Sequence, residues 1–286
     1  MSTQISDVES PIATCLVDLA RSIVASDEYE LPVLPEVSVQ LMKLTADVNC
    51  DPRDIVELFK RDQSLTGHLL KTANSTRYTC GQVVTSIQQA VARLGLLQVR
   101  EIVMLISCQT RIFNVVGFEK DVRRSFDMSL ATAAFSQEIA RVRRLNVEDA
   151  FLCGLMHDIG RPVLLQSLSD NRHNSGNDAT DDEIREAAEE VRILMASKLV
   201  TSWELPERLA TIIEHQDMPI ETTEFDQQAA MLNLAIDLAR MMLDPGTTMP
   251  TVLAHPMLDI LNLYPEDFEG VLARHTTILE WVRAIA

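Results

Sequence analysis

Apolar residues recur at intervals of three and four positions along most of the chain, whereas the alternation typical of strands is almost absent. After Pro35, for example, Val37, Leu41 and Leu44 share one helical face. The pattern predicts an all-α fold, built as a succession of helices with short joints. The predicted helices lie at about 11–25, 35–44, 52–59, 64–73, 86–95, 99–113, 119–145, 149–156, from 181 onward, and at 206–215, 229–243, 257–263 and 265–285.

Capping signals support several of these starts. Asp51 precedes Pro52, so its carboxylate is expected to cap a helix whose first turn holds the proline. Residues 86–89 and 180–183 have the spacing of a capping box, in which two side chains satisfy free amides of the first turn. The polar stretch from Ser169 to Thr180 lacks an apolar period and is predicted as a surface loop or a disordered segment.

Two further residues are expected to interrupt the helices. Gly117 marks a break between two helical halves, and Asn146 is predicted to end the long helix before it. The composition agrees with a helical chain, because nine glycines, eleven prolines and 5% aromatic residues are few for 286 residues.

The charge balance excludes one class of function. Against 42 Asp and Glu stand 25 Lys and Arg, which gives a net charge of −17 at pH 7 and repels phosphate backbones. The small clusters at Arg123-Arg124 and within 141–144 are interpreted as solvated helix surface. We therefore expect no nucleic-acid partner. Part of the excess negative charge lies at 181–190, which indicates a solvent-facing or partner-facing surface.

The cysteines and the apolar runs point to a cytoplasmic location. The five cysteines are far apart and form no C-x-x-C pair, as expected of reduced thiols; they are Cys15, Cys50, Cys80, Cys108 and Cys153. The first residues lack a basic region followed by an apolar stretch, and no uncharged apolar run has the length that spans a bilayer, so neither secretion nor a membrane partner is expected.

The sharpest candidate for chemistry is the segment from Gly154 to Gly160, which contains His157 and Asp158 at the end of an apolar helix. An adjacent imidazole and carboxylate can grip one divalent cation, and the flanking glycines allow close approach. Two ligands are too few for a catalytic metal site, however, which needs three or more and an open position. A histidine packed in the core and bonded to its neighbour explains the pair equally well.

Six short motifs follow one another along the chain: residues 31–35 (LPVLP), 61–66 (RDQSLT), 70–75 (LKTANS), 87–95 (IQQAVARLG), 154–160 (GLMHDIG) and 203–206 (WELP). Together they span about two thirds of the chain and closely resemble the HDOD family, the HD-related output domains of bacterial signalling proteins. The resemblance implies an N-terminal helical bundle packed on an HD-like helical bundle. The expected parts are an extension at 1–30, the first half at 31–117, the HD-like half at 118–220 and completing helices at 221–286.

The family is similar to metal-dependent HD phosphohydrolases, and the resemblance implies where their ligands would lie. Met128 stands at the position of the first His, and Arg192 at a position where a further His is common. His215-Gln216 keeps one residue of a His doublet. Ile236 stands at the position of the distant Asp, with Asp237 on another face of that helix.

At most three ligands remain, His157, Asp158 and His215, which we interpret as a vestigial metal site. Methionine is a poor ligand for hard metals, and a fixed arginine repels a cation. The chain is therefore predicted not to be an enzyme and to need no cofactor, although a divalent metal is conceivable.

The leading hypothesis is a cytoplasmic bacterial signal-transduction module that works through protein–protein contacts, with partners from two-component or cyclic-dinucleotide pathways. The alternative is a metal-dependent phosphohydrolase with an unusual ligand set around His157, Asp158 and His215. A third possibility is a receptor for a small signalling ligand in the cleft between the halves. Asn74 and Ser75 are candidates for a partner-binding or ligand-binding turn, or simply for a helix end.

Overall fold

The computed structural model describes residues 11–27, 29–46, 50–75, 78, 81–111, 115–175, 178–218, 224–244 and 254–285. Within these ranges the chain consists of helices and the joints between them, without strands, and the predicted all-α fold is confirmed. The helices are α1 (Pro11–Ala25), α2 (Glu36–Ala46), α3 (Pro52–Lys60), α4 (Gln63–Ala73), α5 (Ile87–Arg111), α6 (Glu119–Arg143), α7 (Val147–Met156), α8 (Gly160–Ser175), α9 (Asp181–Ser202), α10 (Glu207–Glu214), α11 (Asp226–Leu243), α13 (Met257–Ile260), α14 (Pro265–Leu272) and α15 (His275–Ile285).

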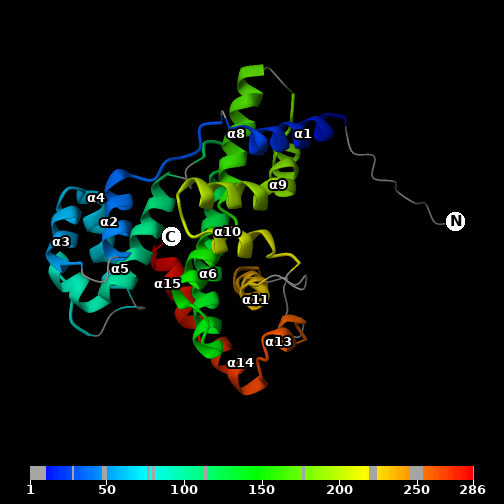
Figure 1. Cartoon of the computed structure of the whole chain (residues 1–286). Helices are drawn as coiled ribbons and strands as arrows, with labels where there is room; N and C mark the ends of the chain where they lie inside the picture. Colours follow the sequence, from blue (N-terminus) through cyan, green and yellow to red (C-terminus); the bar gives the residue numbers. More distant parts are fainter. Residues whose placement is uncertain are drawn as a thin grey trace.

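Helices α2 to α5 form an N-terminal lobe on one side of the molecule (Figure 1). Leu41, Phe59 and Leu69, one from each of α2, α3 and α4, are fully buried in its core. Helix α5 changes direction at Gly95, whose φ of 76° lies in the left-handed region that favours glycine. The sequence pattern predicts that one helix ends at about this position and that another begins a few residues later.

Helix α6 is the centre of the larger lobe and packs against α7 and α11. Gly154 allows the contact with α7, because a Cβ at this position would lie 2.5 Å from the Ala133 Cα atom. Gly160 does the same between α8 and α9, where a Cβ would lie 2.1 Å from the Arg192 carbonyl oxygen. Both glycines therefore permit close helix packing, which is a different role from the close approach to a cation expected of them in the sequence.

The first helix belongs in space to the larger lobe, where it lies on α9 (Figure 1). Lys198 donates from Nζ to the Val24 carbonyl at 2.8 Å and to the Ser26 carbonyl at 2.5 Å. Trp203 donates from Nε1 to the Pro32 carbonyl at 2.8 Å. The chain therefore crosses from the larger lobe to the N-terminal lobe before α2 and returns along α5.

Polar contacts join the two lobes beneath α5. Arg100 forms an ion pair with Glu148 of α7, and Gln137 of α6 donates to Glu101 Oε1 at 2.7 Å. Both Glu101 and Gln137 are buried. Gly117, with a φ of 87°, separates α5 from α6 as predicted.

Several predicted caps are confirmed. Asp51 accepts from the Arg53 amide at 2.9 Å, and Thr180 and Glu183 form a complete capping box. The box at Ser86 differs in one bond, because the Gln89 side chain accepts from the Thr85 amide.

Three expectations about helix ends are wrong. The segment from Ser169 was predicted as a loop, but α8 continues through Ser175, since Ser169 is buried and Arg172 pairs with Asp181 at 2.6 Å. Asn146 caps the start of α7, accepting from two amides, while α6 ends at left-handed Arg144. The last predicted helix is divided into α14 and α15.

Cys15, Cys108 and Cys153 are free thiols, Cys50 donates from Sγ to the Asp51 carbonyl at 3.5 Å, and Cys80 lies outside the described residues. Among the helices described, none combines the length and the apolar character needed to cross a bilayer.

Candidate functional site

His157 and Asp158 lie where α7 ends and α8 begins. Helix α7 is apolar and its last eight residues are buried, so the chain delivers the next two side chains into the interior. His157 is 3% exposed and Asp158 is 6% exposed. Buried polar groups of this kind require partners, which α6, α7, α8 and α9 provide.

The imidazole of His157 is neutral at pH 7. Its Nδ1 lies 2.8 Å from the Gly154 carbonyl oxygen, and because a carbonyl only accepts, the ring proton is on Nδ1. Complete burial lowers the pKa of His157 to about 4, although the Asp158 charge acts in the opposite direction. The lone pair of the ring is therefore on Nε2.

Asp158 is surrounded by donors. Ser125 of α6 donates to its Oδ2 at 2.7 Å, and Arg161 Nε donates to the same oxygen at 2.8 Å. A guanidinium nitrogen of Arg192 from α9 lies 3.5 Å from Oδ1. Burial acts to raise the pKa of the Asp158 carboxyl, but the charges of Arg161 and Arg192 outweigh it and hold the pKa below its usual value.

These residues line a cavity of about 380 Å³, which we call the histidine–aspartate pocket. Its other walls include Met128 of α6, Arg192 of α9 and Ile236 of α11. The family resemblance implied that these three residues stand at ligand positions, and they lie together around His157 and Asp158. Further residues of the pocket are Asp121, Arg124, Glu189, Asp217, Arg240 and Asp244.

His215 is placed differently from the two other residues of the predicted vestigial site. It caps the end of α10, where its Nδ1 lies 2.8 Å from the Thr211 carbonyl, and it is not among the lining residues. Its neighbour Gln216 is fully buried and donates to the His157 carbonyl at 3.1 Å. The Asp237 carboxylate lies 3.1 Å from His255 Nε2 and accepts a hydrogen bond from Arg240.

The pocket contains functional groups that the sequence reasoning missed. Arg161 bridges Asp158 and Glu189, and Arg192 also bonds Glu189 at 2.8 Å. The position of Arg161, three residues after Asp158 at a helix start, could have indicated the pairing. Nothing in the local sequence indicates that Ser125 reaches the same carboxylate.

A divalent cation is a poor fit to these side chains. The carboxylate oxygens of Asp158 face two guanidinium groups, and Met128 and Ile236 offer no hard ligand. Within the part of the chain that the structure describes, no three His, Cys, Asp or Glu side chains come together as metal ligands would.

The turn at Asn74 and Ser75 is bonded internally. Asn74 ends α4, and its side-chain amide donates to the Val84 carbonyl at 2.9 Å and accepts from the Val84 amide at 2.8 Å. Ser75 is buried and donates to the Thr72 carbonyl at 2.7 Å. Asn74 thus holds the loop before α5, Ser75 bonds the last turn of α4, and the binding role of both stays a prediction.

The fold is shared with solved bacterial structures. A protein from Shewanella amazonensis SB2B, provisionally described as a metal-dependent phosphohydrolase, aligns with a TM-score of 0.71 and 19% identity over 94% of this chain and 98% of its own. A protein from Marinobacter aquaeolei VT8, provisionally described as a signal transduction protein, aligns with a TM-score of 0.64 and 20% identity over 96% of this chain and 66% of its own. At these identities the likeness establishes the fold alone.

The family is established by sequence. The family model described as HDOD domain matches residues 31–219, the span over which the motifs resemble that family, and the chain belongs to the HDOD family. A curated relative, an uncharacterized protein of Treponema pallidum (strain Nichols), is 26% identical over 154 residues. That alignment covers 53% of this chain and 29% of the relative's length.

Proposed function

We propose that this protein is a non-catalytic regulatory module of bacterial signal transduction, located in the cytoplasm, which acts by binding other proteins. Its partners would be components of two-component or cyclic-dinucleotide pathways. One observation carries the non-catalytic part: the guanidinium groups of Arg161 and Arg192 lie beside Asp158, where an HD enzyme would need a metal.

The electrostatics of the pocket support this proposal. The carboxylate of Asp158 is already neutralised by fixed cations, which stay charged at every physiological pH. A metal would have to displace arginine side chains that are at most 28% exposed and that also bond Glu189. The signalling part is supported by the family and by the description of the Marinobacter protein.

The alternative function, a metal-dependent phosphohydrolase, retains one favourable observation. The neutral His157 has a free lone pair on Nε2, as a metal ligand or a general base requires. The location of His215 outside the pocket lining argues against the ligand set predicted for such an enzyme.

Metal analysis separates the two functions. Protein purified without chelator is assayed by mass spectrometry for bound metal, and its melting temperature is measured with EDTA and with Mn²⁺. The regulatory proposal expects less than stoichiometric metal and an unchanged melting temperature. Hydrolysis of cyclic dinucleotides or nucleotide phosphates with Mn²⁺, lost in His157→Ala, would instead establish the enzyme.

The binding part needs its own test. Proteins retained from a lysate of the source organism are compared for the unmodified chain and for Asp182→Lys/Glu186→Lys, which reverses charge on the acidic face of α9. Both side chains are exposed. Glu266→Lys/Glu269→Lys on α14 is the matched control. A signalling protein retained by the control but lost by the α9 variant supports the proposal, and failure of every variant to retain one contradicts it.

A further inference from the structure

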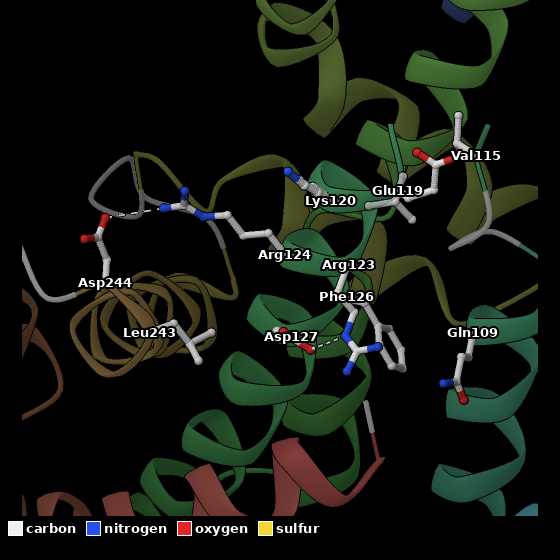
Figure 2. A pocket seen from close by; sticks show the side chains of 11 residues that line it. Gln109, Val115, Glu119, Lys120, Arg123, Arg124, Phe126, Asp127, Leu243 and Asp244 are labelled. Atoms are coloured by element: carbon white, nitrogen blue, oxygen red, sulfur yellow. Dashed lines mark hydrogen bonds and ion pairs between the residues drawn. The ribbon is translucent and has the colours of Figure 1, made fainter. Parts of the chain in front are cut away.

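A second and larger cavity, of about 800 Å³, lies between α5, α6 and α11, and we call it the α6 cavity. Figure 2 shows Gln109 at one side, Leu243 and Asp244 at the opposite side, and side chains of the first turns of α6 between them. Arg124 and Asp244 line both this cavity and the histidine–aspartate pocket. The two cavities are therefore neighbours along α6.

The inner wall of the α6 cavity is apolar. Val115, Val122 and Phe126 are each 2% exposed and line the cavity with Leu243. A cavity of this volume with an apolar wall is typical of sites that enclose the body of a small organic molecule.

The rim of the cavity has spare hydrogen-bond donors. Among the described residues, Arg123 is 58% exposed and meets only Asp127, at 3.4 Å, and Arg124 is 73% exposed and meets only Asp244, at 3.3 Å. A guanidinium has five N–H donors, so most of those on each arginine remain available. Lys120, the third cation, pairs with none of the described residues and is exposed.

Each carboxylate of the rim lies beside a partner. Glu119 accepts from the Gly117 amide at 3.0 Å, and Asp244 accepts from Arg124 at 3.3 Å. Asp127 forms an ion pair with Arg123 at 3.4 Å, and its buried Oδ1 accepts no hydrogen bond from the described residues. The positive end of the α6 dipole also lies here, since the helix begins at Glu119. The rim can thus accept a further negative charge more readily than a positive one, although the whole chain is strongly acidic.

We propose that the α6 cavity is a binding site for a small amphipathic anion. Its apolar body would lie over Val115, Val122 and Phe126, and its carboxylate or phosphate would be held by Lys120, Arg123 and Arg124. In the sequence, Arg123 and Arg124 were interpreted as solvated helix surface. The proposal makes both residues part of a binding site. This inference specifies the small-ligand possibility and does not depend on the function of the histidine–aspartate pocket.

Isothermal titration calorimetry of the full chain tests the proposal with defined probes. Octanoate and octyl phosphate carry the two head groups, octan-1-ol and octylamine test the sign of the charge, and acetate and inorganic phosphate lack the apolar body. We expect one saturable site for at least one of the amphipathic anions, with an affinity about tenfold or more above that of octan-1-ol and octylamine. Whichever anion binds more tightly identifies the head group.

Variants locate the bound probe. Lys120→Glu and Arg123→Glu, both at exposed positions, are expected to weaken binding by about tenfold each. Arg141→Glu lies near the other end of the same helix, is 45% exposed, and should bind as the unmodified chain does. An equal loss in Arg141→Glu, tighter binding of octylamine, or no saturable binding of either anion would overturn the proposal.

The outcome is distinguishable from that of the proposed function. Phosphohydrolase activity lost in His157→Ala would end the regulatory proposal and leave this site unaffected. Absence of binding in the calorimeter would end the site and leave the regulatory proposal standing.

Discussion

The two cavities along α6 contain the same kinds of charged residue in opposite situations. In the histidine–aspartate pocket the side chains of Asp158 and Arg192 are 8% and 15% exposed and form ion pairs within the protein. In the α6 cavity Arg123 and Arg124 are 58% and 73% exposed and make one long contact each. Buried ion pairs are costly to break, whereas exposed pairs contribute little to stability. The arginines of the histidine–aspartate pocket therefore support the fold, whereas Arg123 and Arg124 of the α6 cavity are available to a ligand.

The largest expected effect concerns the backbone packing beside the histidine–aspartate pocket. Gly160→Ala should destabilise the protein by more than about 4 kcal/mol or prevent folding, because the new Cβ would clash with the Arg192 carbonyl of α9. Urea unfolding measures the change. Gly270→Ala on α14, where a Cβ meets nothing within 4 Å, is the control and should remain close to the unmodified protein. Equal stability of the two variants would show that α8 and α9 are not packed this closely.

The next effect tests the ion pairs themselves. Arg161→Ala should lower the free energy of unfolding by about 3 kcal/mol, because it removes the nearest cation from a buried carboxylate. Arg123→Ala in the α6 cavity should change it by less than about 0.5 kcal/mol. Combining Arg161→Ala with Asp158→Asn should recover part of the loss. An equal loss in the free energy of unfolding for Arg123→Ala and Arg161→Ala would show that the ion pairs of the two cavities do not differ in this way.

A smaller effect depends on pH and on His157. The unfolded chain protonates this residue near its ordinary pKa of 6.5, whereas the folded protein does so only near pH 4. Between pH 6.5 and pH 4, unfolding is therefore accompanied by uptake of a proton. The contribution of neutral His157 to the free energy of unfolding is full above pH 6.5 and decreases as the pH falls toward 4. Between pH 7 and pH 5 the loss should be about 2 kcal/mol.

Urea unfolding at a series of pH values measures this slope in the unmodified protein and in His157→Gln, whose amide can still donate to Gly154. The variant should lose most of the slope over that range. His173→Gln, at an exposed position of α8, should keep it. A slope that persists in His157→Gln would mean that other groups cause it.

The smallest effect concerns the α6 cavity. Gln109 has a side-chain oxygen that is buried and has no hydrogen-bond partner among the described residues. Gln109→Leu should therefore stabilise the protein by about 1 kcal/mol, since it removes a polar atom whose desolvation is not compensated. Thermal unfolding without added probe measures the change. A loss of stability would show that Gln109 is satisfied in solution.

Much of the architecture follows from local signals in the sequence. Asp51 and the pair Thr180 and Glu183 cap helices as predicted, since their bonds join residues two or three positions apart. The end of α8 was misjudged because Arg172 is held by Asp181, nine residues away in the chain. Helix length there depends on tertiary contacts that an apolar period cannot reveal.

The candidate site was predictable in part. The convergence of Met128, Arg192 and Ile236 on His157 and Asp158 was expected from the family motifs, and the structure brings these residues together. The location of the α6 cavity could not be predicted from the sequence, because Gln109, Phe126 and Leu243 come from three helices and share no motif. Ser125 was missed for the same reason, since its bond to Asp158 spans 33 residues.

The position of α1 has a consequence for the order of events during synthesis. Its contacts are with α9, where Arg21 meets Glu190 across 169 residues and Lys198 meets Val24 across 174. Helices α2, α3 and α4, in contrast, contact one another and α5 within a short stretch of chain. As the chain leaves the ribosome, the N-terminal lobe can therefore fold while α1 still lacks its partner. Until α9 has emerged, the apolar face of α1 is exposed to any chaperone nearby.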